Sequence, residues 1–236
     1  MPAPPAPRLL EMWERAGACH PLDRALVLLE AGEGDGDRRA LAALPIGARD
    51  ARLCALYRRW FGSPAAVEAR CPACATAIEL DLPLDRVDPT ASPARPRDVT
   101  VAGVTLRLRP PSSEDLAAVA EAGAAAADRL AERCVVDDGG AATAALPAAV
   151  RAALPEALRR LDPDADLVVE TACPDCTAAV ELVVDPSSLL WAQLDGAARR
   201  LLAEIHRLAA RYGWSEEAIL SMPPARRRHY LALAAS

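Results

Sequence analysis

Two turns with the same cysteine spacing lie between stretches in which apolar and polar residues alternate. Each turn reads Cys-Pro-x-Cys, at residues 71–74 and again at residues 173–176. Apolar and polar residues alternate after both turns, from Ala77 to Leu82 and from Ala179 to Val184. An alternation with a period of two predicts half-buried β-strands. Because short runs that could be extended also precede each turn, we expect one strand–turn–strand unit to occur twice.

Apolar residues at helical spacing occupy most of residues 1–62 and 186–236. The most regular helical pattern extends from Gly196 to Arg211, where leucine or isoleucine recurs every three or four residues. Gly213 follows this pattern at the position where a glycine commonly ends a helix. Ser215 then has the side chain of a helix N-cap, with two glutamates in the first turn after it. We therefore expect helices at both ends of the chain.

The segment between the two cysteine turns contains a different hairpin and further helices. Residues 99–109 alternate around Gly103, which predicts a β-hairpin that turns at the glycine. Ser112, with Asp115 three residues later, matches a capping box. This capping pattern predicts a helix that continues to about Cys134.

These patterns predict an α+β fold that is mainly helical. An N-terminal helical region, residues 1–62, precedes a zinc-ribbon-like β module of residues 63–185 with the two Cys-Pro-x-Cys hairpins. Residues 98–162 form an insertion in that module and contain the additional hairpin and helices. A C-terminal helical region, residues 186–236, follows.

The four paired cysteines are the strongest candidates for chemistry. Tetrahedral zinc prefers four soft donors, and two C-x-x-C turns can supply Cys71, Cys74, Cys173 and Cys176 as a complete set of ligands. A shell of four thiolates leaves no position for a substrate or water, so the expected Zn²⁺ is structural. The proline in each turn fixes φ and helps the two thiols of that turn to face one point.

Three other interpretations of the cysteines remain open. A thioredoxin-like redox pair requires the motif at the start of a helix, whereas strands are expected here. Disulfides require an oxidising compartment, and nothing in the sequence marks the chain as secreted. A site that has lost its metal is the third interpretation. Rubredoxin-like turns usually have glycine after the second cysteine, where φ tends to be positive, but this chain has Ala75 and Thr177.

Composition and charge narrow the possible partners. The chain of 236 residues is 52% hydrophobic but only 3% aromatic, which predicts a core of leucine, valine and alanine. All 27 basic residues are arginine, and the net charge of −6 argues against a general affinity for nucleic acid. From residue 197 onward, however, the chain contains seven arginines and three glutamates, which gives a net charge of +4. This basic region is expected to contact another protein or the acidic remainder of its own chain.

The sequence lacks several features of other protein classes. It begins without a signal-peptide pattern, and no run approaches the roughly 18 apolar residues of a membrane span. We therefore expect a cytoplasmic protein without membrane contact, with Cys19, Cys54 and Cys134 as small buried side chains. We find no nucleophile elbow, P-loop, dinucleotide fingerprint or H-E-x-x-H motif. We expect neither an enzyme nor a small-molecule substrate.

The C-terminal block Glu204 to Leu220 reads E-I-H-R-L-A-A-R-Y-G-W-S-E-E-A-I-L, and Pro223, Arg226–Arg227 and Tyr230–Leu231 follow it. This block resembles the baseplate hub assembly chaperones related to those of T-even phages, which occur in contractile phage tails and contractile injection systems. The resemblance extends upstream and covers most of the chain after about residue 20. Its upstream part includes Gly47-Ala48-Arg49-Asp50, the four paired cysteines, Leu106 to Ser112, Asp115-Leu116 and Cys134.

The resemblance implies a non-enzymatic assembly factor (chaperone) whose partners are baseplate or hub proteins of a contractile tail. Two alternatives remain: a structural baseplate subunit that stays in the particle, and a zinc-ribbon adaptor that binds nucleic acid. We expect Trp214, Arg226, Arg227 and Arg228 to bind the partner, because tryptophan and arginine are enriched among interface hot spots. The competing interpretation of Trp214 is that it packs beneath the turn at Gly213.

Overall fold

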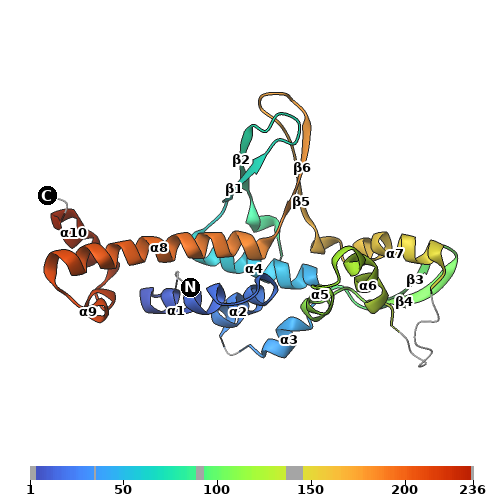
Figure 1. The fold of residues 1–236 in the computed structure, drawn as a ribbon, viewed down its shortest axis with the longest axis horizontal. Helices are drawn as coiled ribbons and strands as arrows, with labels where there is room; N and C mark the ends of the chain where they lie inside the picture. Colours follow the sequence, from blue (N-terminus) through green and yellow to red (C-terminus); the bar gives the residue numbers. More distant parts are fainter. Residues whose placement is uncertain (1–3, 35, 89–92, 137–145, 235–236) are drawn as a thin grey trace.

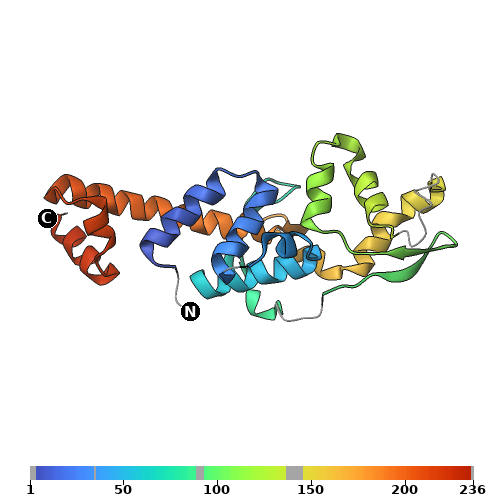
Figure 2. The same cartoon turned by 90° about the horizontal axis from the view of Figure 1, so that it is seen from below.

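The computed structural model describes residues 4–34, 36–88, 93–136 and 146–234. The chain is mainly helical and contains three small two-stranded antiparallel hairpins, as the sequence predicts. The molecule is elongated, and two of the hairpins project together from its middle as an arm (Figure 1). Figure 2 shows that the helices below the arm extend in both directions along the long axis.

Four N-terminal helices form the centre of the molecule. They are α1 (Ala6–Gly17), α2 (Pro21–Glu33), α3 (Arg38–Ala42) and α4 (Ile46–Phe61). They pack with the first half of α8 (Pro186–Tyr212) around a leucine-rich core. Its fully buried large side chains include Leu28, Leu29, Leu53, Leu190 and Leu194. Tyr57 is the buried aromatic member of this core, and Trp60, Phe61 and Trp191 pack against it while partly exposed.

The arm consists of the two hairpins that carry the cysteine turns. β1 (Ala65–Arg70) pairs with β2 (Ala77–Leu82), and β5 (Leu167–Ala172) pairs with β6 (Ala179–Val184). The predicted strand–turn–strand unit is therefore confirmed in both copies. Ala65, Leu82 and Val184 at the base of the arm belong to the central core, so the arm is anchored in the helical body. A short 3₁₀ turn, η1 (Leu84–Arg86), follows β2.

The inner faces of the two hairpins pack against each other. Ile78 and Val180 are buried between them, and Leu80 and Leu182 are partly buried beside that pair. Side chains alternate between the two faces of a strand, so the residues between these positions point outward. This small apolar layer lies directly below the cysteine turns.

A second unit lies at the end of the molecule opposite α10 (Figure 1). Its elements are β3 (Arg97–Val101), β4 (Val104–Leu108), α5 (Ser113–Val119), η2 (Gly123–Ala125), α6 (Ala126–Arg133), α7 (Ala148–Leu161) and η3 (Pro163–Ala165). The hairpin β3–β4 confirms the predicted additional hairpin. This unit has a core of its own, formed by Val101, Leu108, Ala131, Cys134, Val150, Leu154, Leu158 and Leu161.

The helix expected from Ser112 to Cys134 is interrupted. The capping box is present, since the Ser112 hydroxyl accepts from the Asp115 amide while the Asp115 carboxylate accepts from the Ser112 amide. However, α5 ends at Val119, and the chain turns at Gly123, whose φ of +55° lies in the left-handed region. Glycine adopts this conformation readily. The turn allows α6 to pack against α7 rather than to continue along the axis of α5.

The long helix α8 begins at Pro186, ten residues before the predicted start at Gly196. Asp185 accepts hydrogen bonds from the amides of Ser187 and Ser188, and Pro186 occupies the first turn, where a proline is well tolerated. The 27 residues of α8 span about 40 Å at about 1.5 Å per residue. Gly213 ends the helix with a φ of +68°, as predicted. No helix in the described part of the chain has the length and apolarity needed to cross a membrane.

The far half of α8 supports a third packed unit. Ser215 caps α9 (Glu216–Leu220), as predicted, and α10 (Pro224–Ala234) folds back onto α8. The buried residues of this unit are Leu10, Ala198, Leu201, Ile205, Leu208 and Ile219. Leu10 belongs to α1, so the unit is also tied to the N-terminal helices.

Candidate metal centre

The two cysteine turns bring four sulfur atoms together at the tip of the arm. The Sγ atoms of Cys71, Cys74, Cys173 and Cys176 all lie within 4.8 Å of one another. The Cys71 and Cys176 sulfurs are 3.6 Å apart, as are those of Cys74 and Cys173. A disulfide needs about 2.05 Å, and all seven cysteines are free thiols. The four cysteines therefore converge as predicted and could hold a metal ion.

The backbone of both turns follows the same hydrogen-bond pattern. In each turn the carbonyl of the first cysteine accepts from the amide four residues later. The amide of that cysteine donates to the carbonyl five residues later. The donor–acceptor distances are 2.8 Å for Ala75 to Cys71, 2.9 Å for Cys71 to Thr76, 3.0 Å for Thr177 to Cys173 and 2.9 Å for Cys173 to Ala178. The duplication in sequence is thus a duplication in local structure.

Each turn places a residue other than glycine in the left-handed region of φ. Ala75 has a φ of +61° and Thr177 a φ of +58°, at equivalent positions directly after the second cysteine. Such a conformation costs about 1–3 kcal/mol for a residue with a Cβ atom. The missing glycines therefore do not prevent the expected turn geometry. Strain of this kind persists only where the surroundings determine the conformation, and here it is repeated at both halves of one cysteine cluster.

The sulfurs differ in exposure. Cys71 and Cys173, the first cysteines of the two turns, are each only 2% exposed, whereas Cys74 and Cys176 are exposed. The Thr76 hydroxyl donates to the Asp175 carboxylate at 2.6 Å, so the two turns are joined by a hydrogen bond beside the cluster. This contact was not predicted from the sequence. No sequence motif marks either residue, and the two come together only in the folded arm.

The pKa values of the two exposed thiols, Cys74 and Cys176, shift in opposite directions. Hydrogen bonds with the side chain and backbone of Thr76 lower the pKa of Cys74 to about 6. A backbone hydrogen bond with Ala178 lowers the pKa of Cys176, but the neighbouring thiols of Cys74 and Cys71 raise it more strongly, to about 12. The Cys74 thiol therefore loses its proton easily, whereas the neighbouring thiols oppose deprotonation of Cys176. A bound cation would remove that resistance, because it stabilises several thiolates at once.

No protein-family model, curated protein or solved structure matches this chain.

Trp214 packs into an aromatic cluster at the junction of α8 and α10. Its ring stacks on Tyr212 with centroids 4.6 Å apart and meets Tyr230 edge-on at 4.8 Å. The Tyr212 hydroxyl donates to the Tyr230 carbonyl at 3.3 Å. Trp214 is only partly buried, but its contacts are those of the competing interpretation, in which it packs at the turn. Its ring helps to hold α10 against α8.

The three arginines expected to bind a partner do not share one environment. Arg226 and Arg228 are exposed, whereas Arg227 is only 6% exposed. The Arg227 Nε atom lies 3.7 Å from a Glu204 carboxylate oxygen, and its guanidinium also contacts the Met222 carbonyl at 3.5 Å. Successive residues of a helix point about 100° apart, so α10 turns Arg227 inward when its neighbours face outward. The assignment of Arg227 to a partner-binding surface is therefore corrected.

We expect Arg227→Ala to destabilise the unit around α8 and α10 by about 1–3 kcal/mol, because Glu204 would lose its cation and a buried packing contact would disappear. Arg226→Ala, one position earlier and exposed, is the matched control and should change stability by less than about 0.5 kcal/mol. Urea unfolding followed by tryptophan fluorescence measures both. Equal stabilities of the two variants would contradict the structural role of Arg227.

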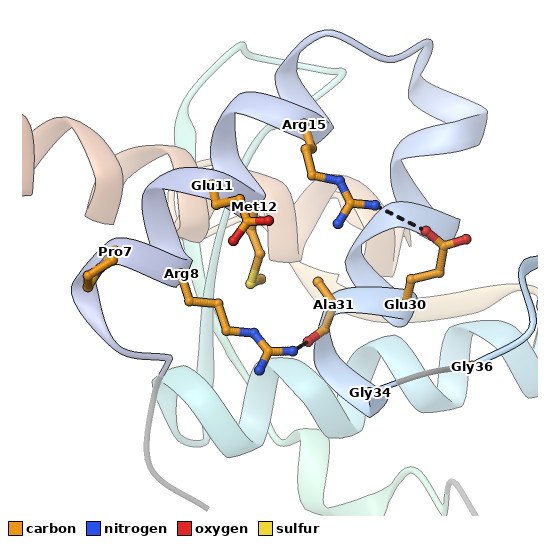
Figure 3. Close-up of a pocket in the computed structure, with 9 residues that line it drawn as sticks. All are labelled: Pro7, Arg8, Glu11, Met12, Arg15, Glu30, Ala31, Gly34 and Gly36. Carbon is orange, nitrogen blue, oxygen red and sulfur yellow. Dashed lines mark hydrogen bonds and ion pairs between the residues drawn. The ribbon is translucent and has the colours of Figure 1, made fainter.

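A hollow of about 620 Å³ lies between α1 and α2 (Figure 3). Arg8 donates to the Ala31 carbonyl at 2.7 Å, and Arg15 pairs with Glu30 at 3.4 Å, so much of its polar lining is already engaged. Its described lining residues include no cysteine, serine or histidine. The hollow therefore offers charged groups that join two helices but no nucleophile paired with a base.

Proposed function

We propose that the four cysteines bind a structural Zn²⁺ ion in a zinc-ribbon-like arm. Four sulfurs that are each about 2.3 Å from a tetrahedral zinc lie about 3.8 Å from one another. In the structure two of the pairs are separated by 3.6 Å and all four sulfurs lie within 4.8 Å of one another. A tetrahedral set of four thiolates is typical of zinc or of iron–sulfur chemistry. Two tight turns at the ends of stacked hairpins favour the single zinc ion.

A bound zinc ion would join two segments that are distant in sequence. The tip of the arm otherwise has only a thin apolar layer around Ile78 and Val180. Because the ligands come together only in the folded arm, the binding free energy of the metal contributes directly to folding. The complete thiolate shell leaves no open coordination position, which supports a structural rather than a catalytic role.

We further infer that the protein is a non-enzymatic assembly factor for the baseplate of a contractile phage tail or a related injection system. The resemblance of the block from Glu204 to Leu220 to baseplate hub assembly chaperones supports a role in a contractile tail or injection system. The observation that carries a docking role is a set of exposed arginines at the same end of the molecule. Among the described residues none of these side chains forms an ion pair: Arg200, Arg207, Arg211, Arg226 and Arg228.

The arginine surface is suited to an acidic baseplate subunit. An exposed cationic patch increases the rate of association with a surface of opposite charge and selects against basic partners. Arg226 and Arg228 contact the partner in this proposal, and Trp214 supports them by fixing α10. Arg227 is excluded because it is buried.

We expect a tagged chain to co-purify with baseplate components from cells that produce the contractile system, and Arg226→Glu with Arg228→Glu to abolish this. The matched control is Arg39→Glu with Arg129→Glu, which makes the same change in charge at exposed positions far from α10. The control should retain the partners. Undiminished co-purification by the first variant would contradict the docking surface.

The composition of the particle separates an assembly factor from a structural subunit. An assembly factor should be abundant in lysate and depleted from purified particles, as measured by quantitative mass spectrometry. A fixed stoichiometry in the particle would instead identify a baseplate subunit. Nucleic acid that co-elutes at physiological salt and is lost in the Arg226/Arg228 variant would favour the adaptor that binds nucleic acid.

A further inference from the structure

The outer face of hairpin β5–β6 carries an apolar pair that nothing in the described chain covers. Val168 and Val183 are directly opposite each other in the ladder, and they are 40% and 71% exposed. Directly opposed residues have Cβ atoms about 4.5–5.5 Å apart, so the two valines form one continuous patch. Two positions closer to the tip on the same face, Glu170 is opposite Glu181. The patch is therefore bordered by negative charge on one side.

The equivalent face of hairpin β1–β2 lacks the apolar pair. Ala66 and Asp81 occupy the positions that correspond to the two valines, while Glu68 and Glu79 repeat the pair of glutamates. Opposed like charges destabilise a hairpin slightly, and none of the four glutamates forms an ion pair among the described residues. The two hairpins thus share their charge, but only β5–β6 combines it with an exposed apolar patch. Hairpin β1–β2 supplies an internal control.

Helix α10 presents the complementary combination. Leu233 is 51% exposed, and it lies seven residues after Arg226, which places both on one side of the helix. Arg228 is also exposed on α10, and neither arginine has an ion-pair partner in the described structure. An exposed apolar side chain with unpaired positive charge on α10 therefore matches an exposed apolar pair with unpaired negative charge on the arm.

These two surfaces cannot meet within one chain. Val183 lies three residues before the start of α8, and α10 packs against the opposite end of that helix through the contact of Tyr212 with Tyr230. The 27 residues of α8 hold the two surfaces about 40 Å apart. Figure 1 shows the arm and α10 at separate places along the molecule. A second copy of the chain can bring its α10 to the outer face of β5–β6, and so provides a partner for both surfaces.

We propose that α10 of one copy docks on the outer face of β5–β6 of another copy. Leu233 contacts Val168 and Val183, while Arg226, which lies on the same side of α10, pairs with Glu170 or Glu181. The contact is head-to-tail, so each copy retains one free surface and further copies can add. This inference does not depend on the proposed baseplate function. It does imply that self-association and docking on a baseplate subunit exclude each other, since both occupy α10.

Sedimentation velocity of the full-length protein tests the contact. We expect the mass to rise above the 24.9 kDa of one chain with increasing concentration at about 0.1 M salt, and to fall back at about 1 M. The screening length drops from about 10 Å to about 3 Å over this range. Glu170→Arg with Glu181→Arg should weaken association at least about tenfold, which corresponds to about 1.4 kcal/mol. Arg226→Glu with Arg228→Glu should do the same.

A mixture of the two variants is the decisive sample. Each variant retains the surface that the other has lost, so an equimolar mixture should associate although neither variant does so alone. Glu68→Arg with Glu79→Arg, which reverses the matched pair on the other hairpin, should associate like the unmodified protein. A monomer at all concentrations in low salt overturns the proposal, as does a mixture that stays monomeric or a control that dissociates. Circular dichroism confirms that each variant is folded.

Discussion

Cys173→Ser is expected to release the metal ion and to unfold the arm. The Cys173 sulfur is buried and lies 3.6 Å from that of Cys74, so its loss removes an inner ligand of the cluster. Three thiolates and a hydroxyl are a much poorer donor set for zinc. Because a metal bound at this site would contribute to folding, we expect a loss of several kcal/mol in the stability of the arm. Elemental analysis of protein purified without chelator should show one zinc per chain before the substitution and little after it.

The destabilisation should be local to the arm. The helices around α4 and α8 have a leucine core of their own, to which the arm contributes only at its base. Far-ultraviolet circular dichroism should therefore change little, while amide exchange should accelerate in residues 65–82 and 167–184. Cys19→Ser is the control, because this thiol lies outside the cluster and is only partly buried. It should leave the zinc content unchanged.

Two results would contradict the metal site. One is substoichiometric zinc in the unmodified protein together with four cluster thiols that titrate freely in the native state. The other is a Cys173→Ser variant that retains both zinc and the slow amide exchange of the arm. The spectrum of cobalt-substituted protein provides an independent check. It should show tetrahedral ligation by thiolates, and an exchangeable water in the metal shell would contradict the structural role.

The arm could be predicted from the sequence because its determinants are local. A period of two, a proline and a pair of cysteines in each turn define both hairpins within about 20 residues. The convergence of the two turns needed only the additional chemical argument that four thiols suit one metal. The caps at Ser112, Asp115 and Ser215 were predictable for the same reason, since a cap depends on residues within three or four positions. A positive φ favours glycine, yet Ala75 and Thr177 adopt it because the turn requires it. The preference of single residues therefore did not decide the conformation at these two positions.

Features that depend on packing between elements could not be predicted. The three consecutive arginines at 226–228 look alike in sequence, and only the contact of α10 with α8 decides that the middle one is buried. Trp214 stacks on Tyr212 of α8 within the turn, but it gains its edge-on contact with Tyr230 only when α10 folds back. The start of α8 at Pro186 was missed although Leu190, Leu194 and Ala198 continue the helical spacing of the later buried positions. The break at Gly123 reflects the packing of α6 on α7.

Asp115→Asn is expected to destabilise the unit that contains β3, β4 and α5 to α7. Asp115 is almost completely buried, and its carboxylate accepts from both Arg109 and Arg133 and from the Ser112 amide. It thereby connects the end of β4, the start of α5 and the end of α6. Removal of one partner from such a buried pair costs about 3–5 kcal/mol. Because the two arginines are partly exposed, we expect about 3 kcal/mol at neutral pH.

The same carboxylate gives this unit a dependence on acid pH. Burial opposes ionisation of Asp115, but hydrogen bonds from Arg109 and Ser112 outweigh it and lower the pKa from 3.8 to about 2. A pKa that is lower in the folded state stabilises the fold at every pH above the unfolded value. That stabilisation disappears as the pH falls from about 4 to about 2. The stability difference between the unmodified protein and Asp115→Asn should therefore be constant above about pH 5 and shrink below pH 4.

Urea unfolding at a series of pH values measures this difference. Loss of a bound metal in acid would affect both proteins equally, so it would cancel in the comparison. Glu114→Gln removes the adjacent but exposed carboxylate and is the matched control, which should track the unmodified protein at every pH. If the stability lost in Asp115→Asn stays the same between pH 7 and pH 2, the ionised carboxylate is not the source of the stabilisation.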